Sequence, residues 1–296
     1  MKKIDLYIVD KTSAGMTLRD YLSHRLHFSR RSIISLKKSG GAFINGEISH
    51  MNVVLQESDK IEISFEDSES ENILPEQMEL DIVFEDEHII VLNKEYGMPV
   101  HPTRRHIMGT LANGLAYYWM DREEQIKIRP INRLDKDTSG LVVFAKNAHI
   151  QHLLSFYVGK EEFKKEYTAI VHGNLLNGSG TIDLPIARET EYGMKRVVRE
   201  VGDRAVTHYK VIAEMKAFSV VNITLETGRT HQIRVHMAHI GHPLLGDELY
   251  GGSTELIGRQ ALHAEKITMF HPLNKKWHIF STPVPRDMQR IITECF

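Results

Sequence analysis

The stretch INRLDKDTSG holds the residues whose types and spacing could do chemistry. Four of them stand at the first, third, fifth and sixth places of a calcium-binding EF-hand loop, namely Asp135, Asp137, Ser139 and Gly140. That loop needs a bidentate acidic ligand at its twelfth place, where this chain has Lys146, whose charge repels a cation. We therefore reject the calcium loop. Asp135 is then either the organiser of a turn or the reacting group of an enzyme.

Three other segments bear on this choice. An aspartate beside Arg133 in a Thr-Ser-Gly turn can simply hold the backbone through side-chain hydrogen bonds. However, the predicted strand KKEYTAIVHG carries Tyr167, and TGRTHQIRVH supplies Arg229 and Arg234. HPLLGDELYGG is a glycine-flanked loop that we expect to shape a pocket. Together these segments favour a cleft that holds a carboxylate, an aromatic ring and cations.

A group of histidines raises the question of a metal. Four fall within twelve residues, namely His231, His236, His239 and His242, and their spacing could suggest zinc. No cysteine lies near them, because the single cysteine of the chain is Cys295. Helical phase also turns the four side chains to different sides. We expect no metal site.

The elements that must position these residues fall into parts that differ in charge. Residues 65–87 carry ten acidic residues and no basic one, although the net charge of the whole chain is only −2. The segment 65–79, with its Ser, Glu and Asn residues and one proline, is typical of a linker. We therefore expect a small module at residues 1–64, an acidic linker at 65–79 and a main domain at 80–296. A nearly neutral total does not argue against a polyanionic partner.

The module combines short helices with short strands. Residues 3–9 predict a strand, and Thr17 and Ser29 are typical N-caps of two helices. Gly40 and Gly41 should end the second helix. Its inward face should consist of Ile33, Ile34 and Leu36. An Asn45-Gly46 turn should join two of the strands that follow.

The main domain mixes strands and helices without a regular β-α-β alternation. We expect strands at 80–94 (two, around an Asp-Glu turn), 141–146, 164–173, 205–215 and 218–226. Helices are expected at 109–120, 148–157 and 229–241, the last with Ile233, Met237 and Ile240 on one face. The fold class is therefore α+β, with a mixed, largely antiparallel sheet flanked by helices and a small N-terminal α/β module.

The two module helices carry a basic face that suits a phosphate backbone. Against a single acid, Asp20, residues 16–40 hold its six bases, namely Arg19, Arg25, Arg30, Arg31, Lys37 and Lys38. From charge alone, a helix pair that is merely solvated is an equally good interpretation. The order LRDYL, SRRSIISLKKSGG, AFINGE and DKIEI adds information, because it resembles the alpha-L RNA-binding fold shared with a small-subunit ribosomal protein.

The main domain resembles the RNA pseudouridine synthases of the RluA/RluD type. The similar blocks are VFEDEHIIVLNKEYGMPVHP, NRLDKDTSGLVVFAK, KKEYTAIVHG, TGRTHQIRVHMAHIGHPLLGDELYG and ALHAEKITMFHP, in the order of the family. The resemblance implies an isomerase that breaks the bond between a uracil nitrogen and its ribose and rejoins the base through carbon. It also implies that the enzyme uses no cofactor and no metal, and that its partner is RNA.

The resemblance implies a role for each matching residue. Asp135 would be the essential carboxylate, and Arg234 would be the cation that keeps it charged, because a lone buried carboxylate tends to be protonated. Tyr167 would lie against the face of the target base. Arg133 would fill the place that the uridine leaves on extrusion from its stack. Arg229 and the other arginines and lysines of the cleft would hold phosphates.

Two positions depart from the family pattern. Asn132 stands where the family usually has histidine, and Glu95 stands where it usually has proline. Glu95 should change only the rigidity of a loop. Asn132 adjoins the proposed reacting residue and could alter its positioning or the choice of substrate. It is the one feature that favours an alternative, a catalytically inactive RNA-binding or ribosome-assembly protein on the same fold.

We therefore expect an RNA pseudouridine synthase that acts on ribosomal or transfer RNA. No apolar run approaches the roughly 18 residues of a spanning helix, so we expect a cytoplasmic protein without a membrane partner. Nothing in the sequence demands more than a monomer. A metal-dependent RNA hydrolase would instead cleave strands and lose activity with a chelator, and we expect neither behaviour.

Overall fold

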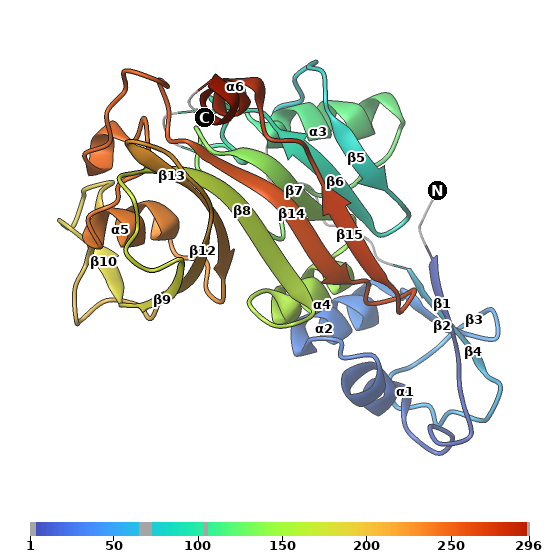
Figure 1. The fold of residues 1–296 in the computed structure, drawn as a ribbon. Helices are drawn as coiled ribbons and strands as arrows, with labels where there is room; N and C mark the ends of the chain where they lie inside the picture. The colour runs from blue at the N-terminus through green and yellow to red at the C-terminus, as the bar shows by residue number, and fades with distance from the viewer. Residues whose placement is uncertain (1–3, 65–72, 104–105, 295–296) are drawn as a thin grey trace.

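The fold belongs to the α+β class, as the sequence predicts. A computed structural model describes residues 4–64, 73–103 and 106–294. Within these residues the chain forms a four-stranded sheet, a two-stranded hairpin and a large nine-stranded sheet (Figure 1). Within the described residues, the strands of the large sheet pair antiparallel except at the short parallel contact of β7 with β14. The expected mixed, largely antiparallel sheet is therefore confirmed.

The first 64 residues form a sheet with its own apolar core. The strand order is β1-β4-β2-β3, with bounds β1 Ile4–Ile8, β2 Ala42–Ile44, β3 Glu47–Ile48 and β4 Lys60–Ser64. The expected turn between β2 and β3 is present, with Asn45 and Gly46 both at positive φ. Helix α2 (Arg30–Ser39) covers the sheet, and the core includes Leu18, Leu22, Leu36, Ile61 and Ile63.

The helix ends of this module follow local capping chemistry. The hydroxyls of Thr17 and Ser29 accept hydrogen bonds from the backbone N–H groups of residues 20 and 32, both at 3.1 Å. Gly40, at φ 65°, ends α2 in the left-handed conformation. Two expectations need correction. The first helix is only α1 (Leu18–Asp20), which passes into the π-helical turn η1 (Tyr21–Arg25), and Ile34 is 46% exposed instead of facing the core.

The segment that composition assigned to a linker is only partly described. Residues 65–72 lie outside the described residues, as does Cys295. Residues 73–79 run along helix α3 (Leu111–Asp121), where the carbonyl of Leu74 accepts from Asn113 Nδ2 at 2.8 Å. Glu76 accepts from the backbone N–H of Gly109 at 2.6 Å. This half of the segment is therefore held against the main domain.

The large sheet has the order β5-β6-β7-β14-β8-β13-β12-β9, and β15 pairs with β14. The bounds are β5 Ile82–Glu85, β6 Ile89–Lys94, β7 Ser139–Ala145, β8 Phe163–His172, β9 Ser179–Asp183, β12 Val206–Glu214, β13 Phe218–Leu225, β14 Leu262–Phe270 and β15 Trp277–Ser281. At the parallel contact, Gly140 has φ 113°, and a Cβ there would lie 2.3 Å from the carbonyl oxygen of Ala264. Only glycine fits this junction.

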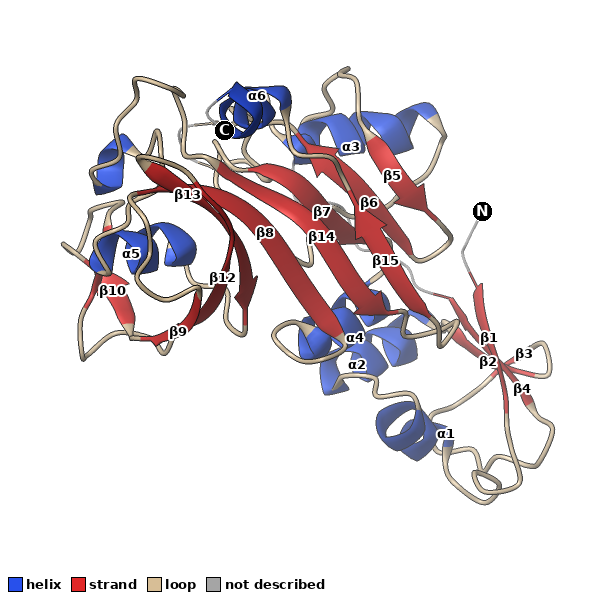
Figure 2. Cartoon of the chain, in the orientation of Figure 1, coloured by secondary structure: helices blue, strands red, loops and turns tan. Residues whose placement is uncertain are grey.

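Helices lie on and beside this sheet (Figure 2). They are α3, α4 (Ala148–Tyr157), α5 (Gln232–His239), the short turn η2 (Glu248–Tyr250) and α6 (Arg286–Glu294). The hairpin of β10 (Ile186–Arg188) and β11 (Arg196–Val198) flanks α5. Among the described residues, no helix combines the length and the apolar composition that crossing a bilayer requires.

Helix α5 starts later than expected. The sequence predicts its start near Arg229, but His231 has φ 57° and is the N-cap, so the helix begins at Gln232. The predicted inward face is confirmed, because Ile233 and Met237 are buried and Ile240 packs against the same core. Gly241, at φ 88°, follows the end of the helix. The late start lets the residues before Gln232 form a loop at the edge of a pocket.

The module contacts the main domain through a ring stack. The ring of Phe28 lies parallel to that of His149, the second residue of α4, with 3.6 Å between the ring centroids. Both side chains are buried. Figure 2 shows α2 of the module beside α4.

Candidate active site

The loop that carries Asp135 is fixed on both sides. Before it, the backbone N–H of Ile131 donates to the carbonyl of Val143 at 2.8 Å, and after it the chain enters β7. Within it, the N–H of Thr138 donates to the carbonyl of Asp135 at 3.1 Å. The loop is thus a tight turn, as the Thr-Ser-Gly sequence predicts, but the turn does not use the Asp135 carboxylate.

Two buried cations, Lys94 and Arg259, donate hydrogen bonds to the backbone of the same loop. The ammonium of Lys94, at the end of β6, donates to the carbonyls of Lys136, Met98 and Glu95 at 2.9, 2.7 and 2.8 Å. Arg259 donates to the carbonyl of Asp137 at 3.2 Å. Burial lowers the pKa of Lys94, and the nearby carboxylates oppose that shift. The loop backbone is therefore positioned by the core of the sheet.

Asn132 points away from the pocket. Its side chain is 5% exposed, and it pairs with the backbone of β7. Its Nδ2 donates to the carbonyl of Leu141 at 3.0 Å, and its Oδ1 accepts from the N–H of Val143 at 2.9 Å. The amide therefore acts like one more peptide unit pairing with the strand. The residue that departs from the family pattern therefore holds the turn, and it is not among the residues that line the pocket described below.

The centre of the site is an arginine shared by two carboxylates. Arg234, on α5, donates from Nε and Nη2 to the two oxygens of Asp247 at 2.7 and 2.8 Å. Its Nη1 donates to Oδ2 of Asp135 at 3.1 Å. Burial alone would lower the pKa of Arg234, but the bonds and charges of the two carboxylates raise it. The guanidinium is thus a fixed positive charge against Asp135.

A histidine and a tyrosine complete the wall beside this arginine. Nε2 of His231 lies 3.8 Å from Oδ2 of Asp135, and its Nδ1 lies 2.9 Å from the hydroxyl of Tyr250. That hydroxyl accepts from the N–H of Arg196 at 2.9 Å, so it can donate its own proton to Nδ1. Burial lowers the pKa of His231, the charge of Asp135 opposes this and that of Arg234 reinforces it. A neutral imidazole then turns its remaining N–H toward Asp135.

A small pocket of about 60 Å³ opens between these residues and Tyr167. Asp135 is 26% exposed in its side chain, so it is half-buried and not fully buried as the sequence suggested. Tyr167, on β8, is 4% exposed, and burial together with the charge of Asp135 raises the pKa of its phenol. The pocket lining also includes Leu134, Leu225, Ile233 and Leu262. A carboxylate, an aromatic ring and apolar walls therefore converge on one hollow.

The structure brings five of the predicted residues together and leaves the rest elsewhere. Arg133 and Arg229 line the pocket with Asp135, Tyr167 and Arg234, and both are exposed to solvent. The module residues are not among those that line it. Of these, Arg19, Arg30, Lys37 and Lys38 have exposed side chains, whereas the side chain of Arg31 lies outside the described residues.

Three of the four histidines that suggested zinc have hydrogen-bond partners in the fold. His236 contacts the hydroxyl of Thr207 and the carbonyl of Leu184, both at 2.9 Å, and His242 contacts the carbonyl of His172 at 2.8 Å. His231 belongs to the wall described above. Among the described residues, no group of three His, Cys, Asp or Glu side chains is placed to hold a metal ion.

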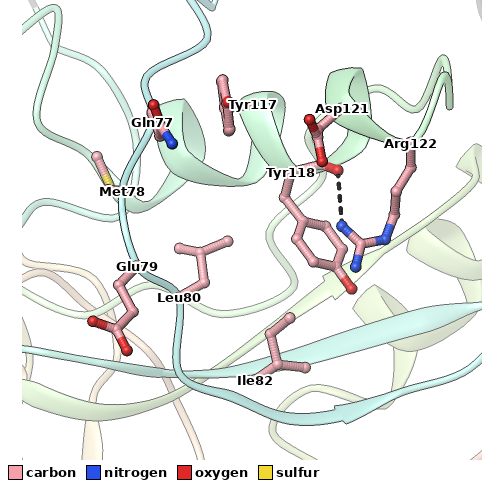
Figure 3. A pocket seen from close by; sticks show the side chains of 9 residues that line it. All are labelled: Gln77, Met78, Glu79, Leu80, Ile82, Tyr117, Tyr118, Asp121 and Arg122. Atoms are coloured by element: carbon pink, nitrogen blue, oxygen red, sulfur yellow. Dashed lines mark hydrogen bonds between the residues drawn. The ribbon is translucent and has the colours of Figure 1, made fainter.

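A larger cavity of about 540 Å³ lies elsewhere, between the segment 77–80 and helix α3 (Figure 3). The guanidinium of Arg122 lies over the ring of Tyr118, 3.6 Å from its centroid, and the Tyr118 hydroxyl donates to Glu85 at 2.6 Å. These groups satisfy one another. No residue of the Asp135 pocket lines this cavity, so the larger of the two cavities is not the candidate active site.

Sequence reasoning missed Asp247, Tyr250 and the role of His231. The loop that carries the first two was expected to shape a pocket, but neither residue was singled out. A buried arginine needs more than one acceptor, and that requirement is the signal that could have directed attention to Asp247. His231 was considered only as a metal ligand. Its left-handed backbone, which turns its ring toward Asp135, has no sequence signature.

Comparisons with known proteins agree with this chemistry. Residues 88–239 match the family described as RNA pseudouridylate synthase. The chain is 39% identical over 291 residues to the uncharacterized RNA pseudouridine synthase YhcT of Bacillus subtilis, covering 98% of this chain and 96% of that one. It is 34% identical over 301 residues to the ribosomal large subunit pseudouridine synthase D of Xanthomonas campestris, covering 97% and 91%. Human RNA pseudouridylate synthase domain containing 1 superposes with a TM-score of 0.57 at 26% identity, over 69% of this chain and 83% of that one.

Proposed function

The chain belongs to the RNA pseudouridylate synthase family, in its RluA/RluD branch, and we propose that it isomerises uridines of a structured RNA with Asp135 as its essential carboxylate. Enzymes of this family are isomerases. The bond between the ribose C1′ and the uracil N1 breaks, and a bond between C1′ and C5 forms. The proton that leaves C5 is matched by one gained at N1, so no redox agent or hydrolytic water is consumed.

The shared arginine is the observation that carries the assignment of Asp135. The guanidinium of Arg234 contacts one oxygen, Oδ2, at 3.1 Å, and the carboxylate lines the pocket opposite Tyr167. A negative charge so held can attack C1′, stabilise positive charge that develops on the sugar, or take a proton from it. Each of these roles needs the charged form beside the ribose.

Tyr167 and Arg133 complete the proposed handling of the nucleotide. Because burial keeps the phenol of Tyr167 protonated, its ring presents a neutral aromatic face against which a base can stack. Arg133 projects into solvent two residues before Asp135, where it can enter the place that the extruded uridine leaves. Arg229 lies at the other side of the pocket, in reach of the RNA backbone.

We also propose that residues 1–64 form an RNA-binding domain, that 65–79 connect it and that 80–296 form the catalytic domain. The separate sheet and core of the first 64 residues support this division. The exposed Arg19, Arg30, Lys37 and Lys38, with Arg31, would bind phosphates of the same RNA. The name of the Xanthomonas relative favours ribosomal over transfer RNA as the first substrate to test.

The alternative, an inactive RNA-binding protein, loses the feature that favoured it. Asn132 was that feature, and its side chain is hydrogen-bonded to the backbone of β7 and does not line the pocket. The carboxylate, the arginine and the tyrosine are all in place. We therefore retain the enzyme as the proposal.

The test is a chemical map of pseudouridine in total RNA from cells with and without this gene. We expect a site that disappears on deletion and returns with the intact gene, but not with Asp135→Asn. Asp137→Asn is the matched control, because it neutralises a carboxylate of the same loop that has no hydrogen bond to Arg234. Turnover by pure Asp135→Asn protein would refute the assignment, and an unchanged map on deletion would favour the inactive alternative.

A further inference from the structure

Lys165 is a buried cation for which the described part of the chain offers no acceptor. Three lysines of the described residues are nearly inaccessible, namely Lys94, Lys146 and Lys165. Lys94 donates to three carbonyls and Lys146 pairs with Glu85, so each has its charge satisfied. Lys165 is 7% exposed, and no described residue accepts a hydrogen bond from its ammonium. Burial alone lowers its pKa to about 8. Such a group costs stability unless a ligand satisfies it.

The position of Lys165 relates it to the Asp135 pocket. It precedes Tyr167 by two residues on β8, so both side chains lie on the same face of the sheet, roughly 7 Å apart along the strand. Its neighbour Lys164 points to the opposite face, is exposed and pairs with Glu161. The buried lysine therefore lies beside the ring on which we place the base, and the exposed one does not.

Because Gly228 has no side chain, a ligand can reach the ammonium of Lys165 from the surface. It lies in the loop between β13 and α5, beside the pocket residue Arg229, and it is exposed. A Cβ built on Gly228 would lie 3.6 Å from Nζ of Lys165 and would meet no other atom within 4 Å. Its φ is not in the left-handed region, so the backbone does not require glycine here. The missing side chain keeps one side of the ammonium open to the surface.

We propose that Lys165 binds a phosphate of the nucleotide whose base lies against Tyr167, and that this phosphate enters over Gly228. The proposal rests on the proposed function, because it places a nucleotide in the Asp135 pocket. In a nucleotide, one ribose separates the base from its phosphate. The distance along β8 between Tyr167 and Lys165 is of the same order, so the ring can contact the base while the ammonium contacts the phosphate. The anion would satisfy the one buried lysine among the described residues that lacks an acceptor.

The first test compares the binding of ribosomal RNA, purified from cells that lack this gene, over a series of potassium chloride concentrations. We expect Lys165→Met to weaken binding about tenfold, as loss of one charge-assisted hydrogen bond would. The slope of log affinity against log salt should become shallower by about 0.7–0.9, which is the value of one phosphate contact. Lys165→Arg should keep the slope, and Lys164→Met should leave both quantities unchanged.

A second variant pair blocks the approach without removing the charge. Gly228→Val should weaken binding as Lys165→Met does, since its side chain would lie over the ammonium. Gly178→Val is the control, because a Cβ there also meets no atom within 4 Å and its φ is ordinary. We expect this control to bind RNA like the wild type.

Two results would overturn the proposal. One is wild-type affinity and salt slope in Lys165→Met. The other is weaker binding with an unchanged slope that Lys165→Arg does not restore, which would assign the lysine a packing role. Product formation by the wild type on the same RNA is measured in parallel. Absence of product there would count against the proposed function, whereas the binding series judges Lys165 by itself.

Discussion

At the residue scale, hydrogen bonds distinguish the proposed reacting residue from a residue that holds the turn. The carboxylate of Asp135 accepts a hydrogen bond from Arg234 and does not stabilise the turn, whereas both polar atoms of the Asn132 amide are hydrogen-bonded to the backbone of β7. Because both residues lie in one short loop, they are easily mistaken for partners in one task. Their hydrogen bonds assign them different tasks, and variants can separate the two.

Asn132→Ala should therefore lower stability and spare the reaction. The change removes two hydrogen bonds, so we expect the free energy of unfolding to fall by about 1–2 kcal/mol. The turnover number should stay within a few-fold of the wild type. Urea unfolding and single-turnover product formation measure the two effects. A large loss of turnover with unchanged stability would mean that Asn132 acts on the substrate.

Lys165 has a stability signature that depends on pH. Its pKa in the folded protein is about 8, against 10.5 as the ordinary value, so the unfolded chain holds the proton more tightly. The cost of burying the charge is fully present below pH 8 and is relieved as the pH rises toward 10.5. Lys165→Met should thus be more stable than the wild type at pH 7, by about 1–3 kcal/mol, and this gain should shrink by pH 10. Urea unfolding at both pH values tests this, and destabilisation at pH 7 would contradict it.

At the element scale, the loop of Asp135 depends on the end of β6. Lys94→Met removes the ammonium that ties the carbonyl of Lys136 to those of Glu95 and Met98. We expect a lower melting temperature and, because the carboxylate shifts, a loss of turnover of about 100-fold. Lys146→Met is the control, since it removes another buried lysine, whose partner is Glu85 and not the loop of Asp135. It should lower the melting temperature alone, and an equal loss of turnover in both variants would refute the link.

Sequence predicted elements well wherever the signal is local. The caps at Thr17 and Ser29, the glycine after α2 and the Asn45-Gly46 turn depend on neighbours within a few residues, and all are present. The π-helical turn, the late start of α5 and the exposure of Ile34 depend on packing that a local pattern does not contain. The same limit explains the site. Asp135 and Arg234 could be named from their motifs, but Asp247 joins them only through the tertiary path of a loop 13 residues further on.

The order of strands is the part that sequence reasoning could not supply. β14 lies between β7 and β8, although in the chain it begins well over 80 residues after the end of either. Gly140 permits this contact, because any side chain there would strike the backbone of Ala264. A glycine in a Ser-Gly-Leu sequence carries no indication of which strand it will meet. Only the assembled sheet places the loop of Asp135 next to α5.

At the scale of the whole molecule, the stack of Phe28 on His149 couples the module to the main domain. Burial, with smaller contributions from His152, His27, His88 and Lys275, lowers the pKa of His149 to about 3. The neutral imidazole is therefore the form that fits the interface. The unfolded chain takes up a proton below about pH 6.5, which the folded chain resists.

The molecule should consequently lose stability at this interface as the pH falls. Between pH 7.5 and pH 5 we expect His149 to account for a loss of about 2 kcal/mol, because the unfolded chain is protonated there and the folded chain is not. His149→Phe keeps a ring against Phe28 and should remove this part of the pH dependence. Unfolding at the two pH values, with hydrogen exchange in α2 as a local probe, provides the measurement. Equal pH dependence in both proteins would exclude His149 as the cause.

The pair of hydrogen bonds from Arg234 to Asp247 has a consequence for repeated turnover. In two of the three proposed roles, attack on C1′ and proton abstraction, Asp135 would lose its negative charge for part of each cycle, and a cation held by that carboxylate alone would then be released. The two hydrogen bonds from Arg234 to Asp247 do not depend on Asp135, so we expect them to hold the guanidinium in place throughout the proposed cycle. When product departs, the guanidinium is still in position to meet the regenerated carboxylate. We therefore expect the site to return to its starting arrangement without rearrangement of Arg234, as repeated turnover requires.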